Sequence, residues 1–366
     1  GIIIAVVVIL FVVFQVLKTQ TSPSKIVENY IEAINNKDYE KLYDYANYTG
    51  DQTFISKKAY TEAVKEKLEG KSTINNFVVG TTTYENGGLT AVVTVNATMR
   101  VGTSTTTTTD SSFEIKLTKE KEKAFLFFPK WTMADDELLG MNTTENYNIT
   151  VPKDTEITYA GVKVTDKYLD KEEKEDYTET YILPQVLTTS TNVEFELPGG
   201  LEIEKEITPS SYSKRYSLSI TTSDLTDKTK EKLTKEATET METTMKGIID
   251  NKSFDDIKSV LAEKPDSEYY KDFAEEYADY LKDVQEDSKK LTSFDVESMT
   301  VSSIGFTRDY QLSLRVRMSY SWTETDNNGE GEDDRYNYVT FYMIPEEDNY
   351  KVVGISSFPA TVSYLW

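Results

Sequence analysis

The chain contains neither cysteine nor histidine among its 366 residues. Without cysteine it forms no disulfide bond, zinc ribbon or iron–sulfur cluster, and it has no thiol nucleophile. Without histidine it lacks the Ser-His-Asp and Cys-His arrangements, the HExxH zinc site and the commonest general base. The sequence therefore predicts no cofactor and no metal, and it favours a protein that is not an enzyme.

Basic residues are also scarce relative to acidic ones. The chain has 40 Lys and Arg against 63 Asp and Glu, which gives a net charge of −23. A surface this acidic repels a phosphate backbone, so we expect no nucleic acid as a partner. The length exceeds one ordinary hydrophobic core and predicts two or three domains.

One long apolar run is present, at the start of the chain. Gly1 to Leu17 reads GIIIAVVVILFVVFQVL, and Lys18 ends it. As a helix it would span roughly 25 Å, close to the hydrocarbon thickness of a bilayer. A buried core helix rarely has so uninterrupted a run, and no signal-peptidase site follows. We therefore predict a transmembrane helix over residues 1–20, with the lipid bilayer as a partner. Its expected anchor side chains are Ile2, Ile3, Ile4, Val6, Val7, Val8, Ile9, Leu10, Phe11, Val12, Val13 and Phe14.

The orientation of this anchor depends on what precedes it, and we expect further residues before Gly1. Lys18 and Lys25 follow the apolar run, which by the positive-inside rule would place the large domains in the cytoplasm. The absence of cysteine fits an exported bacterial protein equally well. Charge alone leaves both orientations open.

Periodicity divides the remainder into three domains. Helical spacing followed by β-rich runs predicts an α+β domain over residues 23–140 and another over 225–366, while short strands predict a small all-β domain over 141–224. In the last domain we predict helices over Asp227–Ile249 and Ser267–Leu291, and four strands. The predicted turns there include an acidic loop, Glu324–Asp334.

The first and last domains also share residues at a constant spacing. Around the end of the first helix, six residues recur as similar residues 215 positions later. Together with the same helix-helix-meander order, this predicts two copies of one fold. The pairs are Ile34 and Ile249, Asn36 and Asn251, Lys37 and Lys252, Tyr39 and Phe254, Glu40 and Asp255, and Leu42 and Ile257.

This pattern resembles a known fold. An apolar helix, the segment NNKDYEKL from Asn35 to Leu42, a second helix and a curved four-stranded sheet are similar to the nuclear transport factor 2-like cone fold. The segment from Ser22 to Leu42 and the run from Lys130 to Leu139 resemble the N-terminal non-catalytic domain of some penicillin-binding proteins, although no transpeptidase motif follows. The resemblance implies a spacer domain near a membrane.

The whole architecture of anchor, cone domain, small β domain and second cone domain resembles the teicoplanin-resistance-associated membrane proteins of Gram-positive bacteria. Members often carry a cytoplasmic zinc ribbon before the anchor, and this sequence has none. The resemblance implies a single-pass protein of the cell membrane with the bulk of its chain extracytoplasmic. It implies no particular activity.

Candidate sites are few. Cone folds often enclose an apolar pocket, and tyrosines near each predicted cone are candidates to line it: Tyr39, Tyr43, Tyr45 and Tyr60 in the first, and Tyr269, Tyr270, Tyr277 and Tyr280 in the second. Tyrosines at these spacings are more often core or rim residues whose hydroxyl reaches water. The acidic Glu324–Asp334 segment has oxygen ligands for Ca²⁺, but its spacing departs from the EF-hand, which favours a solvated hairpin tip.

Three functional hypotheses follow. The leading one is a membrane-anchored envelope protein that acts as a binding protein or scaffold for an envelope protein or a cell-wall component. The second is a pilin-like subunit that self-associates through its apolar N-terminal helix, although Ala5 stands where bacterial type IV pilins usually carry glutamate. The third is a pocket enzyme, which the absence of His and Cys disfavours.

Overall fold

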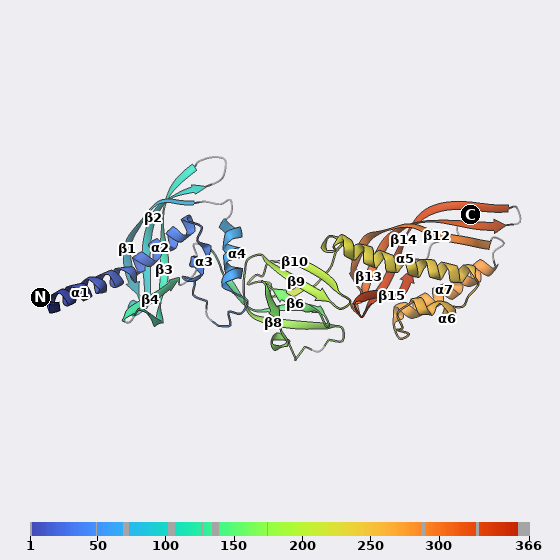
Figure 1. Ribbon diagram of the computed structural model, residues 1–366, viewed down its shortest axis with the longest axis horizontal. Helices are drawn as coiled ribbons and strands as arrows, with labels where there is room; N and C mark the ends of the chain where they lie inside the picture. The colour runs from blue at the N-terminus through green and yellow to red at the C-terminus, as the bar shows by residue number, and fades with distance from the viewer. Residues whose placement is uncertain are drawn as a thin grey trace.

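The computed structural model describes residues 2–48, 50–68, 73–101, 107–125, 127–133, 139–173, 175–286, 290–326 and 329–357. It is a mixed α+β structure whose units follow one another along the long axis, with helix α1 (Ile2–Gln20) projecting at one end (Figure 1). We refer to the elements α2 to β4 as the first α+β unit, β5 to β11 as the middle β unit, and α5 to β15 as the last α+β unit. The predicted α+β class is confirmed.

The first α+β unit consists of three helices and a four-stranded sheet. The helices are α2 (Pro23–Asn35), α3 (Tyr39–Tyr43) and α4 (Lys57–Leu68). The strands pair in chain order as an antiparallel meander: β1 (Thr73–Glu85), β2 (Thr90–Val101), β3 (Thr107–Phe125) and β4 (Phe128–Met133). Helix α2 begins because Ser22 accepts a hydrogen bond from the backbone amide of Lys25, and Pro23 suits the first helical position.

The last α+β unit repeats this order. Its helices are α5 (Asp227–Ile249), α6 (Phe254–Ile257) and α7 (Glu268–Glu286). Its sheet is again a meander in chain order: β12 (Lys290–Phe306), β13 (Leu312–Asp326), β14 (Gly329–Glu346) and β15 (Asn349–Ser356). The first strand of each sheet carries register shifts, two in β1 and three in β12. Such bulges bend a strand, so each sheet curves around its first helix.

The repeat is therefore present in the structure, but its spacing is not constant. Helix α2 ends in a Schellman motif with Lys37 at a φ of 57°, and α5 ends in the same motif with Asn251 at a φ of 56°. In both, the next amide bonds back to a carbonyl five residues earlier, from Asp38 to Ala33 and from Lys252 to Gly247. These equivalences lie 214 positions apart, so the predicted pairings of Ile34 with Ile249, Asn36 with Asn251 and Lys37 with Lys252 are wrong.

An extra residue in the second copy accounts for the change. Ser253 occupies the N-cap of α6 and forms a capping box with Asp256, whereas Asp38 at the N-cap of α3 makes no capping hydrogen bond through its side chain. From there the spacing is 215, so Tyr39 does correspond to Phe254. The 215-residue spacing found in the sequence therefore aligns α3 with α6. The ends of the preceding helices, α2 and α5, align at a spacing of 214 residues.

Two other boundaries differ from the prediction. Helix α7 ends at Glu286 rather than Leu291, because Leu291 is a buried residue of β12. The predicted acidic loop is mostly strand: β13 and β14 pair as far as Asp326 and Gly329. The tip, residues 327–328, and the side chains of residues 326–334 lie outside the described part.

The middle β unit contains two small sheets. One has the order β10-β9-β6-β7, with β6 (Glu156–Tyr159), β7 (Val162–Val164), β9 (Thr191–Leu197) and β10 (Leu201–Ile207). The other has the order β11-β5-β8, with β5 (Thr143–Pro152), β8 (Thr178–Leu187) and β11 (Arg215–Ser217), and β11 pairs parallel to β5. The buried faces of the two sheets contribute to one apolar core, which includes Ile149, Leu183, Val193 and Phe195.

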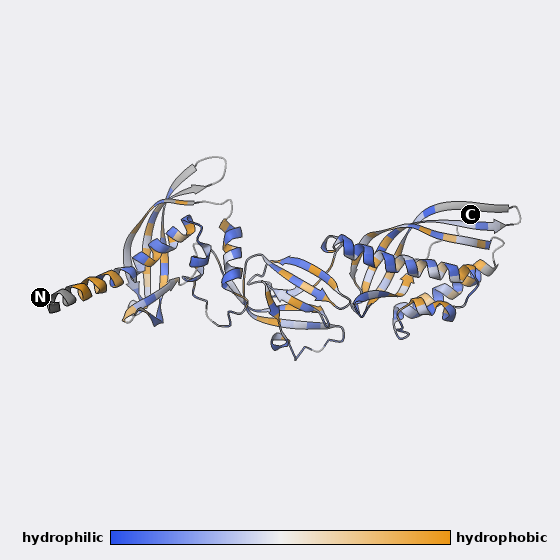
Figure 2. Cartoon of the chain, in the orientation of Figure 1, coloured by the Kyte–Doolittle hydropathy of each residue, from blue (hydrophilic) through white to orange (hydrophobic). Residues whose placement is uncertain are grey.

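Helix α1 is apolar as far as Leu17, and Figure 2 shows its middle turns in orange. From Ile9 to Phe14 the side chains are between 46% and 62% exposed, although Phe14 lies 5.1 Å from Phe128 between ring centroids. Ile2, Ile3, Ile4, Val6, Val7 and Val8 lie outside the residues whose side chains are described. In the described part of the chain, no helix has the length and apolar content to cross a membrane. The predicted span over residues 1–20 is thus not supported.

Candidate functional site

The predicted tyrosines lie in the packing of the two α+β units. In the first unit, Tyr60 is fully buried and its ring meets that of the half-buried Tyr43 at 5.5 Å, while the Tyr43 hydroxyl donates to the carbonyl of Ile55. Tyr39 and Tyr45 pack partly buried against the same core. These side chains fill the space between helix and sheet.

The second set is arranged similarly. Tyr277 is fully buried and donates to the carbonyl of Lys252 at 2.9 Å, and the ring of Tyr270 packs edge-on against Phe254 at 5.4 Å. Tyr280 is partly buried, and Tyr269 stacks on Tyr342 at 4.0 Å. None of these tyrosines lines the groove described next, and a tyrosine-lined cavity stays a prediction.

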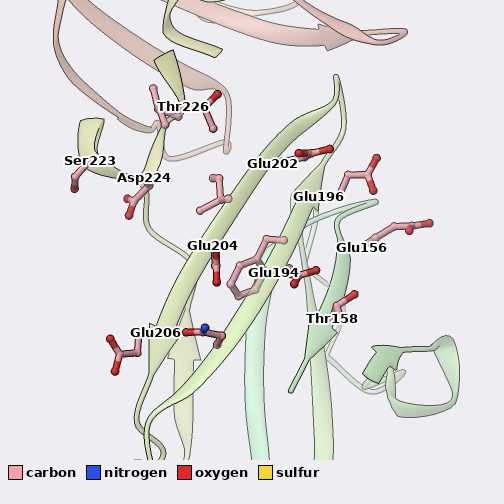
Figure 3. Close-up of a pocket in the computed structure, with 14 residues that line it drawn as sticks. Glu156, Thr158, Glu194, Glu196, Glu202, Glu204, Glu206, Ser223, Asp224 and Thr226 are labelled. Carbon is pink, nitrogen blue, oxygen red and sulfur yellow. The ribbon is translucent and has the colours of Figure 1, made fainter. Parts of the chain in front are cut away.

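A groove of about 770 Å³ lies on the outer face of the β10-β9-β6-β7 sheet. The segment from Ser223 to Thr226, which leads into α5, forms its other wall (Figure 3). Six glutamates line it: Glu156, Glu194, Glu196, Glu202, Glu204 and Glu206. We call this surface the acidic groove.

Strand alternation places these carboxylates together. In β9, Val193, Phe195 and Leu197 are buried while Glu194 and Glu196 are exposed. In β10, Leu201, Ile203 and Ile207 are buried and the three glutamates between them are exposed. Since successive side chains of a strand point to opposite faces, the apolar residues form the core and the glutamates share the outer face.

Pairing between strands then sets like charges opposite one another. Glu196 lies across from both Glu202 and Glu156, and Glu194 lies across from Glu204. Like charges in directly opposite positions destabilise a sheet, so this face lowers the free energy of unfolding of the middle unit. A cationic group placed in the groove would relieve that repulsion.

The groove has few cations of its own. Lys163 forms an exposed ion pair with Glu156 at 2.6 Å, and Ser190 donates a hydrogen bond to Glu206. Among the described residues, Glu194, Glu196, Glu202 and Glu204 form no ion pair. Nor do the described residues contain three acidic side chains close enough to hold a metal ion. The arrangement suits an extended cationic surface rather than a chelated ion.

The wall of the groove is fixed by a more deeply placed ion pair. Lys205 faces away from the neighbouring glutamates and meets Asp224 at 2.5 Å, with the two side chains 17% and 13% exposed. The same Asp224 oxygen accepts hydrogen bonds from the amide and hydroxyl of Thr221. Burial alone raises the pKa of Asp224, but the hydrogen bonds from Lys205 and Thr221 outweigh it and hold the pKa below its ordinary value.

Replacing Asp224 with asparagine should lower the free energy of unfolding by about 2 kcal/mol at pH 7, because Lys205 keeps its charge in a poorly hydrated position without its counter-ion. A carboxyl with a lowered folded-state pKa stabilises above its unfolded pKa of about 3.9 and loses this effect as the pH falls through the folded value. Urea unfolding from pH 7 to pH 3 should therefore show the difference between native chain and variant shrinking below about pH 4. The exposed pair Lys235–Glu239 is the control, and Glu239→Gln should produce no measurable change.

The sequence predicts only short strands for the middle domain, without assigning one to the segment LEIEKEI, so the acidic groove was not predicted. This segment, which forms β10, follows the turn Pro198-Gly199-Gly200 and alternates apolar and charged residues in the manner of a half-buried strand. That alternation, together with the turn and the preceding strand, was the available signal for a hairpin.

Comparison with known proteins adds little. No protein-family model and no curated protein matches the chain. Among solved structures, an "Ntf2 like protein involved in plasmid conjugation" is 10% identical with a TM-score of 0.21, covering 91% of this chain and 99% of its own. The intermembrane space region of the chloroplast protein ARC6 is also 10% identical, with a TM-score of 0.19, covering 31% of this chain and 94% of its own. At these TM-scores neither likeness supports an argument about function.

Proposed function

We propose that the chain is a membrane-anchored, extracytoplasmic cell-envelope protein that works by binding and scaffolding rather than by catalysis. Helix α1 holds it at the membrane, and the two α+β units are cone folds of the nuclear transport factor 2-like kind. The acidic groove binds an envelope protein or a cell-wall component that presents cationic groups.

The observation that carries this proposal is the exposure of α1 at one end of an elongated molecule (Figure 1). Seven apolar side chains between Ile9 and Val16 are 46% to 62% exposed. At about 25 cal/mol for each Å² of apolar surface, leaving such side chains in water is costly. A lipid environment removes that cost and holds the acidic groove away from the membrane, in the middle of the molecule.

A binding role fits the rest of the chain. The glutamates of the acidic groove lie on an exposed sheet face, whereas a pocket enzyme requires a titrating acid or base held in apolar surroundings. The like-charge pairs of the groove lower the stability of the free protein, and binding of a cationic partner would recover it.

Vesicle flotation tests the anchor. The full chain should float with neutral phosphatidylcholine vesicles, and the double variant Leu10→Glu/Val13→Glu should stay at the bottom of the gradient, because the two charges fall on exposed apolar positions. Thr19→Glu/Gln20→Glu, at two exposed positions beyond the apolar run, is the charge-matched control and should float. Equal sedimentation of all three proteins would contradict the anchor.

The alternative is a filament subunit, because the same exposed surface of α1 could be covered by α1 of other copies instead of lipid. Under that hypothesis the full chain forms ordered polymers in the absence of lipid, and Leu10→Glu/Val13→Glu abolishes them. Electron microscopy of the lipid-free protein distinguishes the two cases.

A further inference from the structure

The outer face of the β13–β14 hairpin carries two arginines stacked on two tyrosines. The guanidinium of Arg315 lies 4.9 Å from the ring centroid of Tyr338, and that of Arg317 lies 4.4 Å from the ring centroid of Tyr336. In the sheet, Arg315 pairs directly with Thr340 and Arg317 with Tyr338. Each arginine therefore stacks on the tyrosine diagonal to it on the neighbouring strand. We call these four residues the Arg–Tyr face.

This face is turned to solvent. Along β13, Leu314, Val316 and Met318 are fully buried, so the alternating arginines point away from the core. Tyr336 and Tyr338 are 61% and 41% exposed. Exposed cation–π stacking contributes only about 0.5–1 kcal/mol, so the fold itself gains little from the arrangement.

The arginines are also separated from acid. Arg315 lies between Ser303 and Thr340 in the sheet, and Arg317 lies between Thr300 and Tyr338. Within the described residues neither arginine forms an ion pair. In a chain with 63 acidic and 40 basic residues, such neutral surroundings keep both guanidinium edges open to an external carboxylate. A guanidinium stacked on a ring still presents its N–H groups in its own plane, and it binds a carboxylate through two of them.

The acidic groove matches this face in charge and spacing. Arg315 and Arg317 are two residues apart on one strand, which separates them by about 6.8 Å along it. Glu202 and Glu204 on β10, and Glu194 and Glu196 on β9, have the same two-residue spacing. Two exposed sheet faces can therefore meet with arginines opposite glutamates, at the sheet-to-sheet distance of about 10 Å at which side chains interdigitate.

We propose that the Arg–Tyr face of one molecule docks into the acidic groove of a second copy of the chain. The proposal rests on the proposed binding role of the groove and names its partner, but it does not depend on membrane anchoring. The two faces lie on different units of the elongated molecule (Figure 1), so the contact joins unlike surfaces of two copies. Such a heterologous contact leaves one face free at each end and propagates into a row unless it closes into a ring.

Charge-reversal substitutions on the two faces test this contact. The full chain in detergent micelles is examined by sedimentation velocity at about 0.1 M salt, where the Debye length of about 10 Å screens the repulsion between whole molecules with a charge of −23 but leaves contact pairs intact. We expect reversible association that weakens at about 1 M salt. The variants Arg315→Glu/Arg317→Glu and Glu202→Arg/Glu204→Arg should each weaken it at least about tenfold, or about 1.4 kcal/mol.

Mixing the two variants is the decisive arm, because the reversed faces complement one another and association should return. The control Lys282→Glu/Arg308→Glu makes the same change in net charge at exposed positions of the same unit and should associate more strongly than the Arg315/Arg317 variant. A mixture that fails to associate would overturn the proposal, as would a Glu202/Glu204 variant that associates as the native chain does. Association through α1 would be unaffected by all of these substitutions, and flotation of the native chain would still support the anchor.

Discussion

Replacing Gly354 with alanine should lower the free energy of unfolding of the last α+β unit by about 3 kcal/mol. A Cβ atom at this position would lie 2.3 Å from the carbonyl oxygen of Tyr269 and 2.8 Å from its carbonyl carbon. Both are backbone atoms, so no rotamer change relieves the overlap. Tyr269 is further held by its ring, which stacks on Tyr342, the strand partner of Gly354.

The structural effect of this substitution is confined to the contact between α7 and β15. Alanine at position 354 forces the start of α7 away from β15 and opens the side of the unit where that helix contacts the sheet. Urea unfolding measures the loss. Gly305→Ala is the matched control, because a Cβ there meets nothing within 4 Å, and its effect should stay within about 0.5 kcal/mol. Equal effects of the two substitutions would show that the close approach of α7 to β15 is wrong.

Removing a central aromatic ring from either α+β unit should have the largest effect on stability, and on a different transition in each case. Tyr60 in α4 and Phe273 in α7 are fully buried. Truncating such a ring to alanine costs about 3–5 kcal/mol. We expect Tyr60→Ala to destabilise the first unit and Phe273→Ala to destabilise the last one.

The division of the core explains why two transitions are expected. Most of the buried apolar residues of the first unit form one cluster, which also includes Leu187 of β8, while the middle and last units share a second, continuous one that includes Leu218, Ile220 and Leu225 and takes in Phe54 of the first unit. The turn at Gly199 also packs against Asn349 and Tyr350. Calorimetry should therefore show one transition that falls with Tyr60→Ala and another, comprising the middle and last units together, that falls with Phe273→Ala. A single transition lowered equally by both substitutions would contradict this division.

Much of the fold was predictable because local signals agreed with the tertiary structure. Helix α5 has the predicted bounds, Asp227 to Ile249, since Thr226 caps it and its buried residues recur with helical spacing. The meanders followed from β-branched and aromatic runs between turns. The predicted helix boundary was wrong where a helical apolar pattern runs directly into a strand. Leu291 continues the apolar pattern of α7 but lies in the next strand, β12.

The acidic groove and the Arg–Tyr face were harder to predict because each is assembled between strands. Glu156 and Glu196 are 40 positions apart in sequence and opposite one another in the sheet. In a chain with 63 acidic residues, no short segment marks these glutamates as special. The segments RVR and YNY do show the alternation of the Arg–Tyr face, but the register that stacks Arg317 on Tyr336 depends on the pairing of β13 with β14.

The central claim is that the bulk of the chain stands outside the cell, held by its N-terminal helix. The absence of cysteine allows a direct measurement: Tyr212→Cys places a single thiol at a side chain that is 100% exposed in the middle β unit. In intact cells that produce the full-length protein, a membrane-impermeant maleimide should label this variant in the membrane fraction, and the same protein without the substitution should stay unlabelled. Labelling of Tyr212→Cys only after lysis, or its recovery in the soluble fraction, would contradict the account.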